Sequence, residues 1–152
     1  MAFNEKFVSA GLFAVLAILA LTVTTMTPSH PDVLYRPDTI STLLLSPRYL
    51  LFTVTLASAL SALVYFVLAH WLPSTPNKYL ILVHFVLLAI GLLIAAEAVM
   101  GWASALSYAT QAGSTVYIAW HSPIVLIGFT SVALSCAIVL VNLGITAIKC
   151  FR

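Results

Sequence analysis

The sequence predicts an all-α integral membrane protein, an antiparallel bundle of four transmembrane helices. Of its 152 residues, 62% are hydrophobic and only 7% are charged, whereas a soluble domain carries roughly 25% charge. Four long apolar stretches contain only one of the Asp, Glu, Lys and Arg residues between them. Six Lys and Arg in the whole chain are too few for a basic stripe along a nucleic acid. A water-soluble protein and a nucleic-acid partner are therefore both excluded.

Each apolar stretch has the length of a membrane span. A helix rising 1.5 Å per residue needs roughly 20 residues to cross about 30 Å of hydrocarbon. The stretches lack the alternation of polar and apolar residues that a β-barrel would need, so they are helices. We expect one domain over residues 1–152 with spans at 7–26, 49–72, 79–102 and 124–148.

The first span resembles a signal peptide, because Lys6 precedes an apolar run. Its 20 residues exceed the roughly 7 to 15 of a secretory h-region, and residues 22–27 offer no clean A-x-A cleavage site. We therefore retain it as a helix.

The boundaries of the later spans carry capping signals. Serines precede Pro47 and Pro123, and proline is well suited to the first position of a helix. Asn77 follows a Pro-rich break and is a good N-cap for the third span. Because few residues join the second and third spans, these two helices should form an antiparallel hairpin.

The distribution of positive charge predicts the orientation. With both termini in the cytoplasm, four basic residues flank the inner side and two the outer side, as the positive-inside rule favours. The outer loops are then 27–46 and 103–122. The second begins ASALSYATQAG, which is good helix-forming sequence, so we expect the third helix to extend past the bilayer. The basic residues are Lys6, Lys78, Lys149 and Arg152 inside, and Arg36 and Arg48 outside.

Glu97 is the one acidic residue within a span. It follows Tyr79 by 18 residues, or about 27 Å of helix, which puts it one to two turns below the outer boundary. Two interpretations stay open: a structural glutamate with a polar partner, or a proton or cation site. His121, at the outer mouth of the fourth span, is the first partner to consider.

His70 and His84 lie on either side of the predicted hairpin. Rings at similar depth could supply two axial ligands to a haem, or ligate a chlorophyll magnesium, although two interfacial histidines explain them more simply. Haem and chlorophyll are thus alternatives to a protein with no cofactor, and no metal site is expected.

Small residues occur where helices should meet, and their spacing permits the close backbone approach that drives helix association in lipid. They serve either the bundle itself or a second membrane protein. Cys136 is expected to be a buried small residue, and Cys150, beside Lys149, is a candidate for palmitoylation. The small residues singled out for helix packing are Ala57, Ser61, Gly91, Ala95, Gly128, Ser131 and Ser135.

The hairpin reads SPRYLLFTVTLASALSALVYFVLAHWLP and then NKYLILVHFVLLAIGLLIAAEAVMGW. Together with four spans and short tails, it resembles the MARVEL-type tetraspan superfamily, which includes the Casparian-strip-like plant membrane proteins. The overlap is best at Arg48-Tyr49, at the Ser/Ala-rich centre that follows, and at Val64-Tyr65. The plant proteins carry an arginine in the first span and an aspartate in the third, and here only Glu97 is charged. The resemblance implies a role in membrane organisation.

No CxxC, HExxH, GxSxG, Walker A or EF-hand motif is present, so no catalytic site is expected. We therefore expect a non-enzymatic, multi-pass membrane protein that acts as a scaffold or accessory subunit and packs against lipid, itself or other membrane proteins. The alternative is a small redox, pigment-binding or ion-handling subunit that uses His70, His84 and Glu97.

Overall fold

The computed structural model is all-helical over the residues it describes, which are 2–26, 47–71, 75–111 and 123–150. Side chains are described for 7–26, 49–71, 75–101 and 123–150. The four helices are α1 (Ala2–Met26), α3 (Pro47–Trp71), α4 (Lys78–Gln111) and α5 (Pro123–Cys150). Each contains a segment long and apolar enough to cross a membrane, which is compatible with the predicted multi-pass membrane protein.

The predicted helix starts are confirmed at three positions. Pro47 and Pro123 are the first residues of α3 and α5, where the missing proline N–H leaves no hydrogen bond unmade. Asn77 caps α4, because its Oδ1 accepts the Tyr79 N–H at 3.0 Å and its carbonyl accepts the Ile81 N–H at 3.1 Å. The predicted first span, 7–26, coincides with the apolar segment Phe7–Met26 of α1. The helix itself begins five residues earlier, at Ala2.

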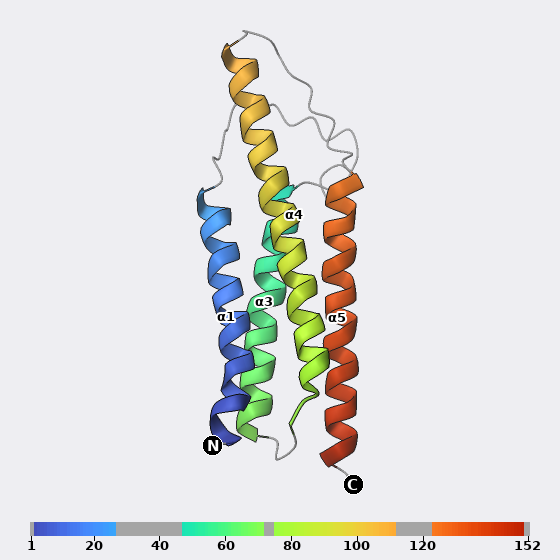
Figure 1. The fold of residues 1–152 in the computed structure, drawn as a ribbon. Coiled ribbons are helices and arrows are strands. Elements are labelled where there is room, and N and C mark those ends of the chain that lie inside the picture. The colour runs from blue at the N-terminus through green and yellow to red at the C-terminus, as the bar shows by residue number, and fades with distance from the viewer. Residues whose placement is uncertain (1, 27–46, 72–74, 112–122, 151–152) are drawn as a thin grey trace.

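α4 is much longer than a bilayer requires. It has 34 residues, or about 51 Å of helix against roughly 30 Å of hydrocarbon. Figure 1 shows its C-terminal part extending past the ends of the other three helices. The expected extension of this helix beyond the span is confirmed as far as Gln111.

The helices lie side by side, with the N and C labels at the same end of the drawing (Figure 1). We call this end the termini end. α1 packs mainly on α3 and α5 mainly on α4, while α3 and α4 also contact one another. Contacts between α4 and α5 run in opposite residue order. The contacting pairs are Asn77 with Asn142, His84 with Ser135, Gly91 with Val132, and Ile94 near Gly128.

Only one stripe of each helix is buried, although the helices are apolar all round. On α1 the buried stripe is Ala10, Phe13, Leu16 and Ala20, which follows the helical repeat. Leu93 of α4 and Leu140 of α5 are 70% and 67% exposed. Such surfaces are favourable in lipid and costly in water, so the exposed stripes are suited to contact with acyl chains.

Two glycines allow α3, α4 and α5 to approach closely. A Cβ built on Gly128 would lie 2.4 Å from Leu50 Cδ2 and 3.1 Å from Ile94 Cγ2. One built on Gly91 would lie 3.0 Å from Val132 Cγ2 and 3.2 Å from Ser131 Oγ. A Cβ at Gly144 would meet nothing within 4 Å. Gly91 and Gly128 therefore serve contacts within this chain.

Gly128→Val should destabilise the bundle, because the new side chain overlaps the fully buried Leu50. Overpacking of this kind costs about 1–3 kcal/mol in free energy of unfolding. Gly144→Val is the matched control on the same helix and should change stability by much less. Unfolding of the purified variants in mixed micelles, followed by circular dichroism, measures both. Equal losses in the two variants would contradict the packing described here.

Candidate functional site

The interior of the bundle contains a polar cluster around His84. The His84 side chain is 1% exposed, and α3 supplies partners for both of its ring nitrogens. Ser61 Oγ lies 3.1 Å from Nε2, and the Tyr65 hydroxyl lies 3.2 Å from Nδ1. Ser61 and Tyr65 are four residues apart and therefore share one face of α3. The imidazole is thus held by two hydroxyls from one neighbouring helix.

The hydrogen bonds of Ser61 indicate the protonation pattern of the ring. Ser61 Oγ donates its single proton to the Ala57 carbonyl at 2.7 Å. Toward His84 it can then only accept, so Nε2 carries the proton. Nδ1 is left as an acceptor, and the Tyr65 hydroxyl donates to it. The arrangement matches a neutral imidazole with the proton on Nε2.

A second polar contact inside the bundle is made by Asn142 of α5, which is 1% exposed. Its Oδ1 accepts the Asn77 N–H at 2.9 Å, and its Nδ2 donates to the Asn77 carbonyl at 3.4 Å. The amide therefore ties α5 to the residue that caps α4.

The bonds around His84 form one chain in which every donor points the same way. The Tyr65 O–H donates to His84 Nδ1, the His84 Nε2–H to Ser61, and Ser61 to the Ala57 carbonyl. Each hydroxyl has one proton to donate. If donor and acceptor exchange roles in one of these hydrogen bonds, they must therefore also exchange roles in the next. We call this series the donor chain.

The other helices close around the cluster. The ring of Phe13, from α1, lies 4.5 Å from the His84 ring and 5.1 Å from the Tyr65 ring, centroid to centroid. From α5, Ser135 Oγ donates to the His84 carbonyl at 3.4 Å. All four described helices therefore meet at His84.

One hydroxyl beside the cluster has no partner. Ser58 Oγ is buried and makes no hydrogen bond with the residues that the structure describes. It lies one helical turn from Ser61 on the same helix. Buried polar atoms without partners lose their hydration with nothing in return. Ser58 is thus a suitable control for Ser61, because both are buried serines of α3 and only Ser61 makes hydrogen bonds.

The two histidines are not brought together. His84 is level with Ser61 and Tyr65, so His70 lies at least five residues, or about 7.5 Å, farther along α3. His70 is exposed, and its ring stacks on Phe66 at 6.4 Å and 2°. Both nitrogens of His84 are occupied by hydroxyls. This geometry does not fit the expected pair of axial ligands for a haem.

Glu97 points away from the bundle. Ala95 and Val99 are buried while Glu97 is exposed, and a two-residue step turns about 200° round a helix. Glu97 lies three residues after Ile94, which is about 4.5 Å farther along the axis of α4. Ile94 itself lies beside Gly128 and Leu50. Glu97 therefore lies near the levels at which α3 and α5 begin. No hydrogen bond or ion pair joins it to another described residue, and His121 lies outside the described residues.

The small residues expected to serve helix packing lie between the helices. Ser135 and Ala95 are fully buried, and Ala57 is half-buried. Cys136 was expected to be buried and this is wrong, because it is one residue past Ser135 and lies exposed on α5. Cys150 is half-buried at the end of α5. The other small residues that were expected to serve helix packing are all buried, namely Ser61, Gly91, Gly128 and Ser131.

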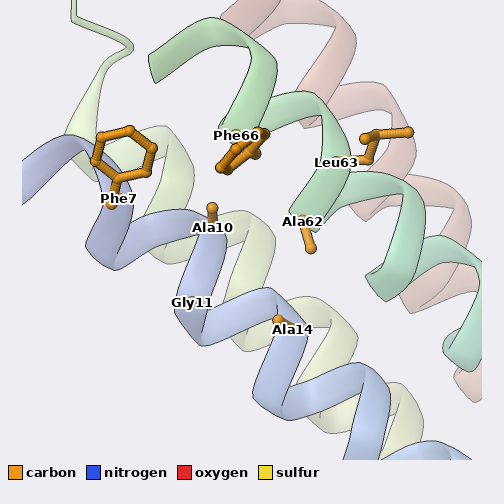
Figure 2. A pocket seen from close by; sticks show the side chains of 7 residues that line it. All are labelled: Phe7, Ala10, Gly11, Ala14, Ala62, Leu63 and Phe66. Atoms are coloured by element: carbon orange, nitrogen blue, oxygen red, sulfur yellow. The ribbon is translucent and has the colours of Figure 1, made fainter. Parts of the chain in front are cut away.

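An open groove runs between α1 and α3. It has a volume of about 440 Å³ and only apolar side chains line it. Figure 2 shows the small side chains on both helices, with the rings of Phe7 and Phe66 toward one end. With no polar group in its lining, it offers contact to an apolar group and no chemistry. Its lining residues are Phe7, Ala10, Gly11, Ala14, Ala62, Leu63 and Phe66.

Sequence reasoning considered His84 only as an interfacial residue or as an alternative haem ligand, and it missed Tyr65 as its partner. A signal was present, because Ser61 and Tyr65 are spaced by one helical turn, and His84, Gly91 and Ala95 share a stripe of α4. Among the described residues, no group of three or more His, Cys, Asp and Glu side chains forms a metal site. No family model, curated protein or solved structure matches the chain.

Ser61→Ala should destabilise the bundle, and Ser58→Ala should not. The first removes the acceptor of the His84 Nε2–H, which costs about 1 kcal/mol or somewhat less between membrane helices. The second removes a hydroxyl that has no partner, so the free energy of unfolding should stay level or rise slightly. The two variants are compared by unfolding in mixed micelles. A larger loss for Ser58→Ala than for Ser61→Ala would contradict the assignment of the cluster.

Proposed function

We propose that this protein is a non-enzymatic tetraspan scaffold or accessory subunit of a larger membrane assembly. The observation that carries the proposal is that the buried polar side chains form hydrogen bonds between helices. His84 bonds to Ser61 and Tyr65 of α3, and Asn142 bonds to Asn77, instead of lining an open cavity. They therefore hold the bundle in one shape.

The surface of the bundle supports the same function. The exposed stripes of the helices are apolar, and α4 extends beyond the other three (Figure 1). A rigid bundle with an apolar outside and one projecting helix is suited to packing laterally against other membrane proteins. The proposal accordingly places contacts with partners at the outward stripes and at α4.

The proposed topology is an antiparallel bundle with both termini in the cytoplasm. The opposite residue order of the α4–α5 contacts supports the antiparallel part. The excess of Lys and Arg at the termini end and at the connection before α4 supports the orientation. Cys150 would then lie at the cytoplasmic surface, within reach of palmitoylation.

Assembly is tested by isolating the protein from native membranes into nanodiscs and weighing the particles by mass photometry. The proposal predicts a colourless species in a complex larger than one 16.3 kDa chain plus its nanodisc. Tandem mass spectrometry identifies what accompanies it. A strict monomer without any accompanying protein would contradict the proposed function.

Topology is tested separately with a membrane-impermeant maleimide in a Cys136→Ser background, after hydroxylamine has cleaved any thioester. Cys150 should react in sealed membrane vesicles whose cytoplasmic face points outward. A Ser114→Cys, Cys150→Ser control, with its cysteine in the second predicted outer loop, should react only after the vesicles have been lysed. The reverse pattern would overturn the orientation.

A further inference from the structure

We propose that one exposed side of α4 is the docking site for a transmembrane helix of a different protein, which carries a Lys or Arg beside Glu97. The proposal rests on the proposed function, because it names the contact face of the scaffold and the chemistry of its partner. We call this side of the helix the α4 stripe. Its members, all exposed, are Val83, Val86, Ile90, Leu93, Glu97 and Met100.

The α4 stripe has the geometry of a surface that accepts a helix. Its members follow one another at alternating steps of three and four residues, so they lie on one side of α4 along its apolar segment Lys78–Gly101. Helices packed along such a seam cross at about 20° and stay in contact over several turns. Leu93 and Met100, on either side of Glu97, are 70% and 66% exposed.

Glu97 decides which partner the α4 stripe fits. Among the residues whose side chains are described it is the one Asp or Glu, and no other described residue bonds to it. It lies four residues before Gly101, where the apolar segment ends, or about 6 Å along the helix. A carboxylate can only accept hydrogen bonds. A helix that covers the stripe therefore has to bring a donor to this level.

A second copy of this chain does not meet that requirement. Two copies in one membrane have the same orientation, so packing along the α4 stripe would place their Glu97 side chains opposite each other. Neither carboxylate donates, and like charges that face each other across an interface are unfavourable. A wholly apolar helix would cover Glu97 and offer it no donor at all.

A Lys or Arg at this level meets the requirement. Its head group donates charge-assisted hydrogen bonds to the carboxylate. Its long stem can lie along apolar side chains such as Leu93, while the head stays near the membrane surface. The apolar members of the α4 stripe then supply the contact area, and the charged pair selects the partner and its register.

The first test uses synthetic helices in place of the partner. The host is a Leu/Ala helix of about 24 residues with uncharged ends, and it carries Lys, Glu or Leu at the level of Glu97. Association with the full chain, labelled at its N-terminus, is measured by Förster transfer in phosphatidylcholine vesicles. We expect the Lys host to bind about fivefold more tightly than the Glu and Leu hosts, as one strong polar contact between membrane helices gives.

Two variants show whether Glu97 makes this difference. Glu97→Gln should remove the preference for the Lys host, and Glu97→Lys should transfer it to the Glu host. Because no other described residue bonds to Glu97, Glu97→Gln should keep the thermal midpoint of the wild type, which is the control for folding. Equal binding of the three hosts by the wild type, or a preference that survives in Glu97→Gln, would overturn the proposal.

The second test finds the contact in native membranes. The photo-crosslinker p-benzoylphenylalanine is placed at Ile90 on the α4 stripe or, as the control, at Leu140 on the exposed side of α5. We expect a crosslink from Ile90 to a transmembrane segment of another protein that has a Lys or Arg level with Glu97. Its yield should fall about fivefold in Glu97→Lys.

The remaining outcomes separate this proposal from the proposed function. A crosslink from Ile90 to a second copy, or to a segment without a basic residue, would overturn the α4 stripe proposal and leave the scaffold function standing. Crosslinks to other proteins from Leu140 alone would do the same. If neither position captures a protein, both the α4 stripe proposal and the proposed function are contradicted.

Discussion

The structure depends on one constraint, the need to give a buried imidazole two partners where there is no water. Lipid cannot satisfy a polar atom, so every hydrogen bond must come from another helix or from the backbone. His84 meets this need with Ser61 and Tyr65, and the requirement fixes the rotation of α3 relative to α4. Phe13, Ser135 and Asn142 then set α1 and α5 against the same pair. An apolar core alone would leave these rotations less well determined.

The glycines and the polar cluster act at different levels of the bundle. Toward the end opposite the termini, Gly128 and Gly91 let backbones approach, and Leu50 fills the space beside Gly128. Toward the termini end, hydrogen bonds from Tyr65 and Asn142 replace close packing. The fold therefore combines one half that is held by close packing with one that is held by hydrogen bonds between helices.

The spans could be predicted from the sequence because hydropathy and length are properties of each segment by itself. The same holds for Pro47, Pro123 and Asn77 at helix starts, and for the extension of α4, whose sequence favours helix. The candidate site was harder to predict. Because the helices are apolar all round, little in the pattern shows which stripe faces inward, and hydrogen bonds such as that of His84 with Tyr65 depend on that rotation. Glu97 attracted attention as the one charge in a span, yet it points outward, while neutral Tyr65 and Asn142 organise the interior.

The most direct test of this account is the protonation pattern of His84, read by nitrogen-15 NMR of the full chain in bilayers and assigned by the signal lost in His84→Gln. The account predicts a neutral ring at pH 7.5, with the proton on Nε2 and with Nδ1 as a hydrogen-bond acceptor whose shift changes in Tyr65→Phe. A proton on Nδ1, or a charged ring at that pH, would contradict the donor chain on which the account rests.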